Sequence, residues 1–216
     1  MRNQYNEQLN TLNKQLVEMG ALCEFGIAKA MKALETGDAE MVSQTNAVEK
    51  QIDEKESAIE SMCVRIILNQ QPVAHDLMFV SAALKMITDM ERIGDQAADI
   101  ADFALEIKIP ESKRNTDITD MAHQVINMVT NTVEAFVNRD MAAAIMVKES
   151  DNIVDALFDK IKAELSTEVT SGKKTIEEAL DILMIIKYLE RIGDHAVNIA
   201  EWVEFAMTGR HDLKEE

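Results

Sequence analysis

Apolar residues recur every three or four positions along nearly the whole chain, the spacing that places side chains on one face of an α-helix. The first such run ends near residue 34, and Gly37 follows it as a suitable C-terminal residue. We therefore predict a first helix that stops at Gly37. Its apolar stripe consists of Leu9, Leu12, Leu16, Met19, Cys23, Ile27, Met31 and Leu34.

Two more helices are predicted before the middle of the chain. Asp38 is a suitable N-cap for the second, because its side chain can accept a hydrogen bond from a free backbone N–H. Pro72 fits the first turn of a third helix that runs to about Leu105, since its missing N–H would have no intrahelical partner there. The polar, helix-breaking segment 110–115 is then a linker.

The same plan returns after the linker. Helices are expected at about 117–138 and 140–170, with a break at Arg139 between them. Thr175 and Glu178 form a capping-box pattern, in which each side chain satisfies a backbone N–H of the other, and this pattern starts the sixth helix.

The two halves are also related in sequence. The segment 90–102 reappears as 189–201, which aligns Glu91 with Glu190 at a shift of 99 residues. We therefore predict an all-α protein of two tandem antiparallel three-helix bundles related by internal duplication. The expected parts are a first repeat at 1–109, a linker at 110–115 and a second repeat at 116–216.

Composition supports this fold and narrows the function. The chain has only 7 Gly and 2 Pro, too few turn residues for a many-stranded protein. Its 22 Lys+Arg and 39 Asp+Glu give a net charge of −17. A field of that sign repels phosphate backbones, so we expect no nucleic-acid binding. Two isolated cysteines suit a reducing cytoplasm, and no run of uncharged residues is long enough for direct membrane insertion.

Carboxylates four residues apart share a helix face, and such pairs occur at matching places in both repeats. Like charges at this spacing cost about 0.2–0.5 kcal/mol per pair, which suggests a compensating cation. Carboxylate oxygens are ligands for hard metal ions, and Fe, Zn, Mn and Mg are all candidates. The candidate ligands are Glu49, Asp53, Glu91, Asp95, Asp99, Asp151, Asp155, Glu190, Asp194 and Asn198.

Simpler interpretations exist for the same residues. Exposed acid pairs on a helix are usually just solvated, and Gly94 and Gly193 are explained equally well by close helix packing. Arg92 is expected to form surface ion pairs, and His195 to be a polar residue on a helix face, because ferritin-like sites need Glu and His three residues apart. The sequence has no recognisable catalytic motif, so we do not expect an enzyme.

The doubled Glu-Arg-Ile-Gly-Asp segments at 91–95 and 190–194, the upstream acid pairs and the segment 71–77 together resemble the PhoU family of phosphate-specific transport accessory proteins. The resemblance implies two tandem three-helix bundles that bind metal through paired acids. Residue by residue, the pairs are Glu49/Asp53, Glu91/Asp95, Asp151/Asp155 and Glu190/Asp194.

The resemblance also implies a role. A PhoU-like protein would be a cytoplasmic negative regulator of phosphate uptake and starvation signalling, an adaptor between a phosphate ABC transporter ATPase and a sensor histidine kinase. A homodimer and a peripheral place at the membrane complex are compatible with that role. The alternative is an acidic helical protein that binds or stores metal without signalling. Met78 and Asn198 depart from the family pattern, so the second site is expected to differ from the first.

Overall fold

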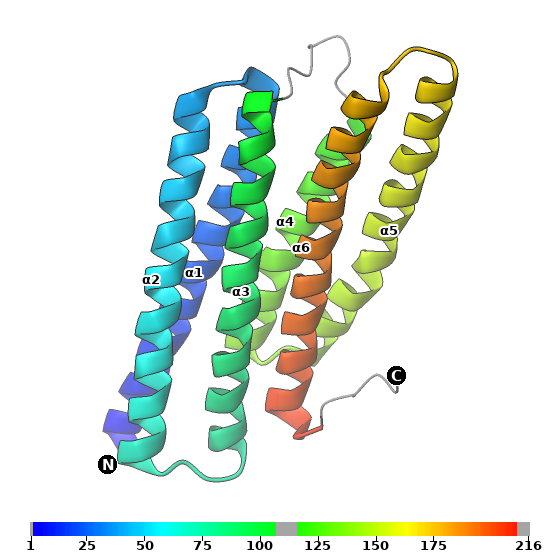
Figure 1. Cartoon of the computed structure of the whole chain (residues 1–216). Coiled ribbons are helices and arrows are strands. Elements are labelled where there is room, and N and C mark those ends of the chain that lie inside the picture. The colour runs from blue at the N-terminus through cyan, green and yellow to red at the C-terminus, as the bar shows by residue number, and fades with distance from the viewer. Residues whose placement is uncertain (1, 107–115, 211–216) are drawn as a thin grey trace.

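The computed structural model describes residues 2–106 and 116–210, and within these ranges the chain is helical with no strand (Figure 1). The all-α prediction is therefore confirmed. The helices are α1 (Arg2–Thr36), α2 (Ala39–Gln70), α3 (His75–Glu106), α4 (Thr116–Asn138), α5 (Met141–Thr170) and α6 (Ile176–Thr208).

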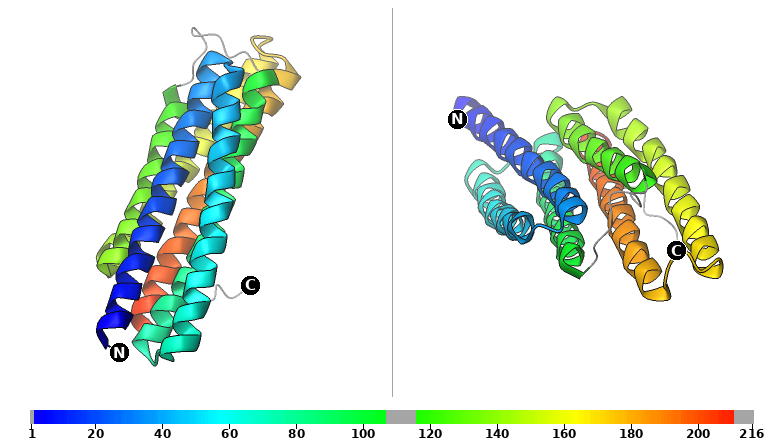
Figure 2. Two further views of the ribbon diagram at one scale, coloured as in Figure 1. Left: turned by 90° about the vertical axis from the view of Figure 1, so that its left-hand side faces the viewer. Right: turned by 90° about the horizontal axis from the view of Figure 1, so that it is seen from above.

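The helices form two antiparallel groups of three, α1–α3 and α4–α6, which stand side by side (Figure 2). The groups meet where α3 packs on α6 and α1 packs on α4, whereas α2 and α5 pack mainly within their own groups. The prediction of two tandem three-helix bundles is confirmed. The predicted linker at 110–115 lies outside the described residues.

Helices α3 and α6 occupy the middle of the molecule, and their apolar side chains form much of the core. Met90 and Ile93 on α3 are fully buried, as are Leu189 and Ile192 at the equivalent places on α6. Burying each such side chain contributes roughly 1.5–3 kcal/mol, so these residues help to hold the centre of the molecule together.

The turns α1–α2 and α4–α5 have the same design. Asp38 caps α2 by accepting a hydrogen bond from the N–H of Glu40, and Asp140 caps α5 by accepting one from Ala143. Directly before these caps, Gly37 and Arg139 both have positive φ, 64° and 54°. The predicted breaks at 37 and 139 are confirmed, as is the capping box of Thr175 with Glu178.

The prediction that Pro72 lies in the first turn of the third helix is wrong. Helix α2 ends at Gln70, its C-cap Gln71 adopts a left-handed conformation with φ 46°, and α3 begins only at His75. Ala74 also has positive φ, 49°. Two left-handed residues turn the chain between antiparallel helices here, and Pro72 lies in the loop between them.

Close packing explains the glycine in the middle of α3. A Cβ atom on Gly94 would lie 2.8 Å from Cδ1 and 3.3 Å from Cγ2 of Ile52, which is buried on α2. Helices α2 and α3 therefore approach one another across Gly94, and their carboxylates are brought together by the same approach.

We expect Gly94→Ala to lower the free energy of unfolding by up to about 2 kcal/mol, because overpacking against Ile52 costs roughly 1–3 kcal/mol and the helix-propensity gain offsets only about 1 kcal/mol of that cost. Gly26→Ala is the matched control. Its Cβ would make only ordinary contacts, at 3.6 Å from Val48 and 3.7 Å from Ala97. Urea denaturation gives the free energy of unfolding of both variants. If both were stabilised equally, the close approach of α2 to α3 at Gly94 would be contradicted.

Candidate metal centre

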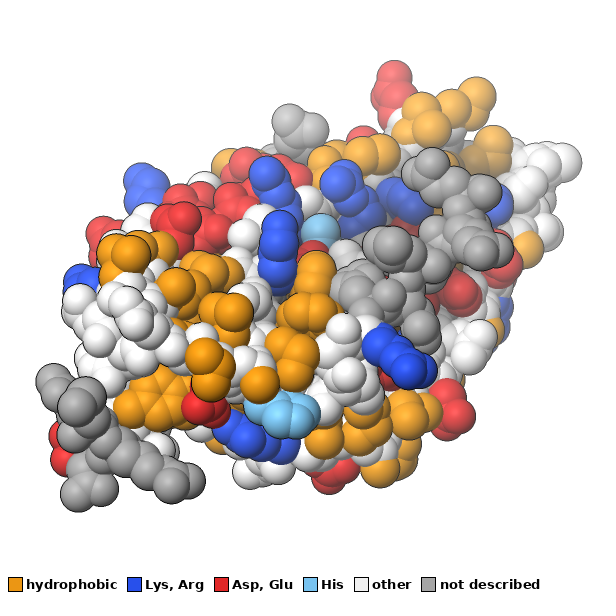
Figure 3. All heavy atoms as spheres, turned by 90° about the horizontal axis from the view of Figure 1, so that it is seen from below, with side chains coloured by type: hydrophobic (Ala, Val, Ile, Leu, Met, Phe, Trp, Pro, Cys, Tyr) orange, Lys and Arg blue, Asp and Glu red, His pale blue; other side chains and the backbone are white. Residues whose placement is uncertain are grey.

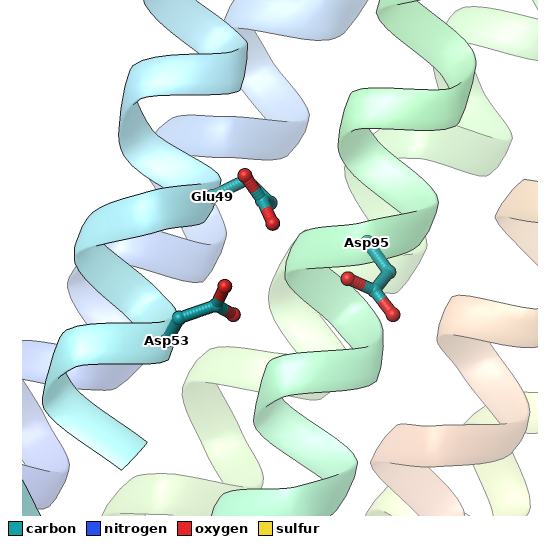
Figure 4. Close-up of side chains that lie close together, drawn as sticks. All are labelled: Glu49, Asp53 and Asp95. Carbon is teal, nitrogen blue, oxygen red and sulfur yellow. The ribbon is translucent and has the colours of Figure 1, made fainter. Parts of the chain in front are cut away.

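Three carboxylates converge between α2 and α3. Glu49 and Asp53 lie one turn apart on α2, and Asp95 faces them from α3 (Figure 4). One oxygen from each carboxylate can be chosen so that all three lie within 4.8 Å of one another. Two of the four acid pairs predicted as ligands thus contribute to one group.

This spacing suits a hard cation. Oxygen ligands lie about 2.0–2.6 Å from Mg²⁺ or Ca²⁺, so two ligands on one ion are separated by at most about 4–5 Å. The three oxygens, within 4.8 Å of one another, are near the upper end of that range, so small side-chain rotations would be needed to bring them onto one ion. Glu49, Asp53 and Asp95 could therefore hold a metal ion, with further positions left for water or another oxygen donor.

The proton affinities of these groups reflect their crowding. Burial raises the pKa of the Glu49 carboxyl above its ordinary value, and the charges of Asp53 and Asp95 raise it further. Burial also raises the pKa of Glu91, with Asp95 adding to the shift and Arg92 opposing it. Each of these carboxylates would be stabilised by a nearby positive charge.

Arg92 supplies part of that charge from the edge of the group. Its guanidinium lies 2.9 Å from the Asp95 carboxylate and 3.4 Å from that of Glu91, so the predicted ion pairing is confirmed. The Arg92 side chain is 54% exposed. Exposed ion pairs contribute only about 0–1 kcal/mol, and Arg92 pairs with neither Glu49 nor Asp53.

The second repeat is arranged differently. Burial and the charge of Glu190 raise the pKa of Asp194, with a smaller contribution from Asp155, while Lys187 opposes the shift. Lys187 forms an ion pair with Glu190, and the equivalent residue of the first repeat is Thr88. Across residues 2–106 and 116–210, no group of three possible ligands forms in the second repeat.

Asp151 remains close to the middle of α6. One of its carboxylate oxygens lies 3.2 Å from the place where a Cβ on Gly193 would be. The second glycine thus gives room to an acid of α5, just as Gly94 lets Ile52 of α2 approach α3. Both repeats use a mid-helix glycine to bring neighbouring helices together.

The last residue of each predicted stripe faces the contact between the repeats. Asn198 of α6 donates a hydrogen bond from Nδ2 to Asp89 of α3 at 3.1 Å, and Nδ1 of His195 lies 2.9 Å from the same carboxylate oxygen. Asp99 has a pKa raised by burial and by Asp95, and lowered by Arg191 of α6. Neither Asp99 nor Asn198 belongs to the three-carboxylate group.

Three residues near these sites were missed by the sequence reasoning. Glu56 lies three positions after Asp53 on the same face of α2, accepts a hydrogen bond from Thr88 and raises the pKa of Glu91. Its spacing was a usable signal. Lys187, three residues before Glu190, offered a similar signal, whereas the pairing of Asp89 with α6 depends on how the two repeats dock.

Comparison with known proteins follows the same division into repeats. The PhoU domain matches this chain twice, at residues 16–104 and 118–203. The chain belongs to the PhoU domain family. A relative from Pseudomonas putida, named phosphate-specific transport system accessory protein PhoU homolog, is 34% identical over 208 residues, covering 95% of this chain and 81% of the relative. A homologue of that name from Clostridium acetobutylicum is 33% identical, covering 95% of both chains.

Solved structures of the family share the fold. The crystal structure of PhoU from Pseudomonas aeruginosa matches with a TM-score of 0.87 at 34% identity, covering 95% of this chain and all of that one. The phosphate transport system regulatory protein PhoU from Streptococcus pneumoniae matches with a TM-score of 0.87 at 27% identity. Among the residues that the structure describes, no helix is both long enough and apolar enough to cross a bilayer.

We expect Asp53→Asn to weaken divalent-metal binding at least tenfold, because it removes one of three converging carboxylates. The metal-free protein should keep its stability or gain a few tenths of a kcal/mol, since a like-charge contact is relieved. Asp155→Asn, the equivalent change in the second repeat, is the control and should leave the tightest site intact. Calorimetric titration with Mn²⁺ distinguishes them, and unchanged binding by Asp53→Asn would refute the ligand assignment.

The raised carboxyl pKa values predict a pH dependence of stability. Between the unfolded and folded pKa values of Glu49 the folded state binds more protons, so this residue's contribution to stability falls as pH rises through that range. Glu49→Gln should therefore reduce the fall in stability of the metal-free protein as pH rises just above the ordinary pKa of a glutamate carboxyl. Unfolding midpoints of both proteins across this range measure the difference, and a steeper fall in the variant would show the sign to be wrong.

Proposed function

We propose that this protein is a cytoplasmic accessory of phosphate transport that restrains uptake and starvation signalling when phosphate is plentiful, and that it acts by binding rather than by catalysis. The observation that carries the proposal is the match of the PhoU domain to both repeats, in a family whose curated relatives are named phosphate-specific transport system accessory proteins.

The acidic group supplies a means of binding. A cation held by Glu49, Asp53 and Asp95 would keep open coordination positions, because hard ions take six or more oxygen ligands. A carboxylate or phosphate on a partner could fill them. Without the ion, the same face carries uncompensated negative charge and would repel an acidic partner surface.

The proposed partners are the ATPase of a phosphate ABC transporter and a sensor histidine kinase, which the protein would link. A chain with net charge −17 favours basic partner surfaces and disfavours nucleic acid. Two similar bundles side by side offer two related surfaces, which suits a protein that contacts two partners at once.

Deleting the gene should leave phosphate-starvation genes expressed, or phosphate uptake unrestrained, at high phosphate, because the restraining contact is lost. A starvation-gene reporter and phosphate uptake are the two measurements. Complementation with Asp53→Asn should fail if the ion is needed for the contact, while Asp155→Asn should restore control.

The competing function is an acidic metal-binding or storage protein without a signalling role. Its single supporting observation is the carboxylate group itself. Unchanged reporter expression and uptake in the deletion strain, combined with lower cellular metal content, would favour storage over regulation. Recovery of a transporter ATPase or histidine kinase with the tagged protein from phosphate-replete cells would favour the adaptor.

A further inference from the structure

A second candidate site lies at one end of the molecule, where α3, α6 and the α4–α5 turn meet. The surface there encloses a cavity of about 270 Å³. Figure 3 looks onto this end and shows apolar side chains gathered around a hollow, with a histidine and basic side chains beside them. The lining residues are His75, Phe79, Phe136, Arg139, Val203, Ala206 and Met207.

The floor of the cavity is apolar and well packed. Phe79 of α3 and Phe136 of α4 stack with ring centroids 4.4 Å apart and an interplanar angle of 20°, and both rings are buried. Val203 from α6 is also buried at this floor. Both repeats therefore contribute to the walls, and the cavity exists only because the repeats are docked.

The mouth of the cavity carries basic side chains. The guanidinium carbon of Arg139 lies 4.9 Å from the ring centroid of Phe79, and His75 lines the same opening. Both residues are exposed. Arg139 forms no ion pair within 4 Å among the described residues, although it and the Asp76 carboxylate both lie near the Tyr5 phenol.

The backbone of Arg139 gives independent support for a role of its side chain. Arg139 has φ +54°, whereas the equivalent turn of the first repeat has Gly37 at φ +64°. Both residues precede an aspartate N-cap, so glycine satisfies this turn without strain. A residue with a side chain in the left-handed region carries a backbone strain that glycine avoids, so the second repeat keeps an arginine here at the expense of that strain.

A guanidinium binds planar or tetrahedral oxyanions through two parallel hydrogen bonds, and an aromatic floor favours an apolar ligand body. We propose that this cavity binds a small organic anion, whose phosphate or carboxylate group contacts Arg139 and His75 while its ring-sized apolar body packs on Phe79 and Phe136. The site shares no residue with the acidic group and goes beyond the proposed function, on which it does not depend.

The test is titration of the full chain with phenyl phosphate, with benzoate as the carboxylate counterpart. Isothermal titration calorimetry measures the binding directly. We expect saturable binding with Kd of about 1 mM or below for at least one of these anions. Inorganic phosphate and phenol, which each carry half of the ligand, should bind at least tenfold more weakly.

Arg139→Gly is the decisive variant, because glycine is the residue of the equivalent turn and removes the strain. It should weaken binding at least tenfold while the melting temperature stays unchanged or rises. Lys162→Gln removes one exposed positive charge from α5 outside the cavity and should leave binding intact.

Three results would overturn the proposal. The first is that neither phenyl phosphate nor benzoate binds saturably. The second is that the Arg139→Gly variant binds as tightly as the wild-type chain. The third is that Lys162→Gln loses as much affinity as Arg139→Gly, which would indicate general charge attraction. Inorganic phosphate binding as tightly as phenyl phosphate would overturn the role of the apolar floor.

Discussion

The packing of α3 on α6 is the constraint on which the rest of the molecule depends. Each of these helices is covered by two helices of its own repeat and by its counterpart in the other repeat. Little of their surface is therefore left for solvent, and their acids must face α2 or α5, or lie at the contact between the repeats. The Asp89 hydrogen bonds and the end cavity follow from this contact, whereas the acidic group depends on the approach of α2 to α3 across Gly94.

Most of the fold could be predicted from the sequence because its signals are local. Asp38, Asp140 and Thr175 all act as N-caps, as their positions before apolar runs indicated. Pro72 misled the prediction, since proline suits both a first helical turn and a loop. The loop is set by the left-handed backbone at Gln71 and Ala74. Neither glutamine nor alanine favours that conformation, so the sequence gives no sign of it.

The site was only partly predictable, for a geometric reason. With 3.6 residues per turn, positions four apart drift around the helix by about 40° at each step. Glu91 and Asp95 can both lie near α2, but by Asp99 the stripe has turned toward the other repeat, where Arg191 partly opposes the rise in the pKa of Asp99 that burial causes. Which carboxylates meet across two helices depends on their relative register, and a single sequence does not contain that register.

Lys187 has a consequence for symmetry. Duplication alone would give the protein two interchangeable faces, but the second repeat carries an ammonium beside Glu190 where the first has Thr88. The ammonium is part of the chain, so that face keeps a constant charge, whereas the charge of the first face would change with the ion content of the cell. A partner that could otherwise bind either repeat would then prefer one of the two faces. The duplicated protein would therefore dock in a single orientation.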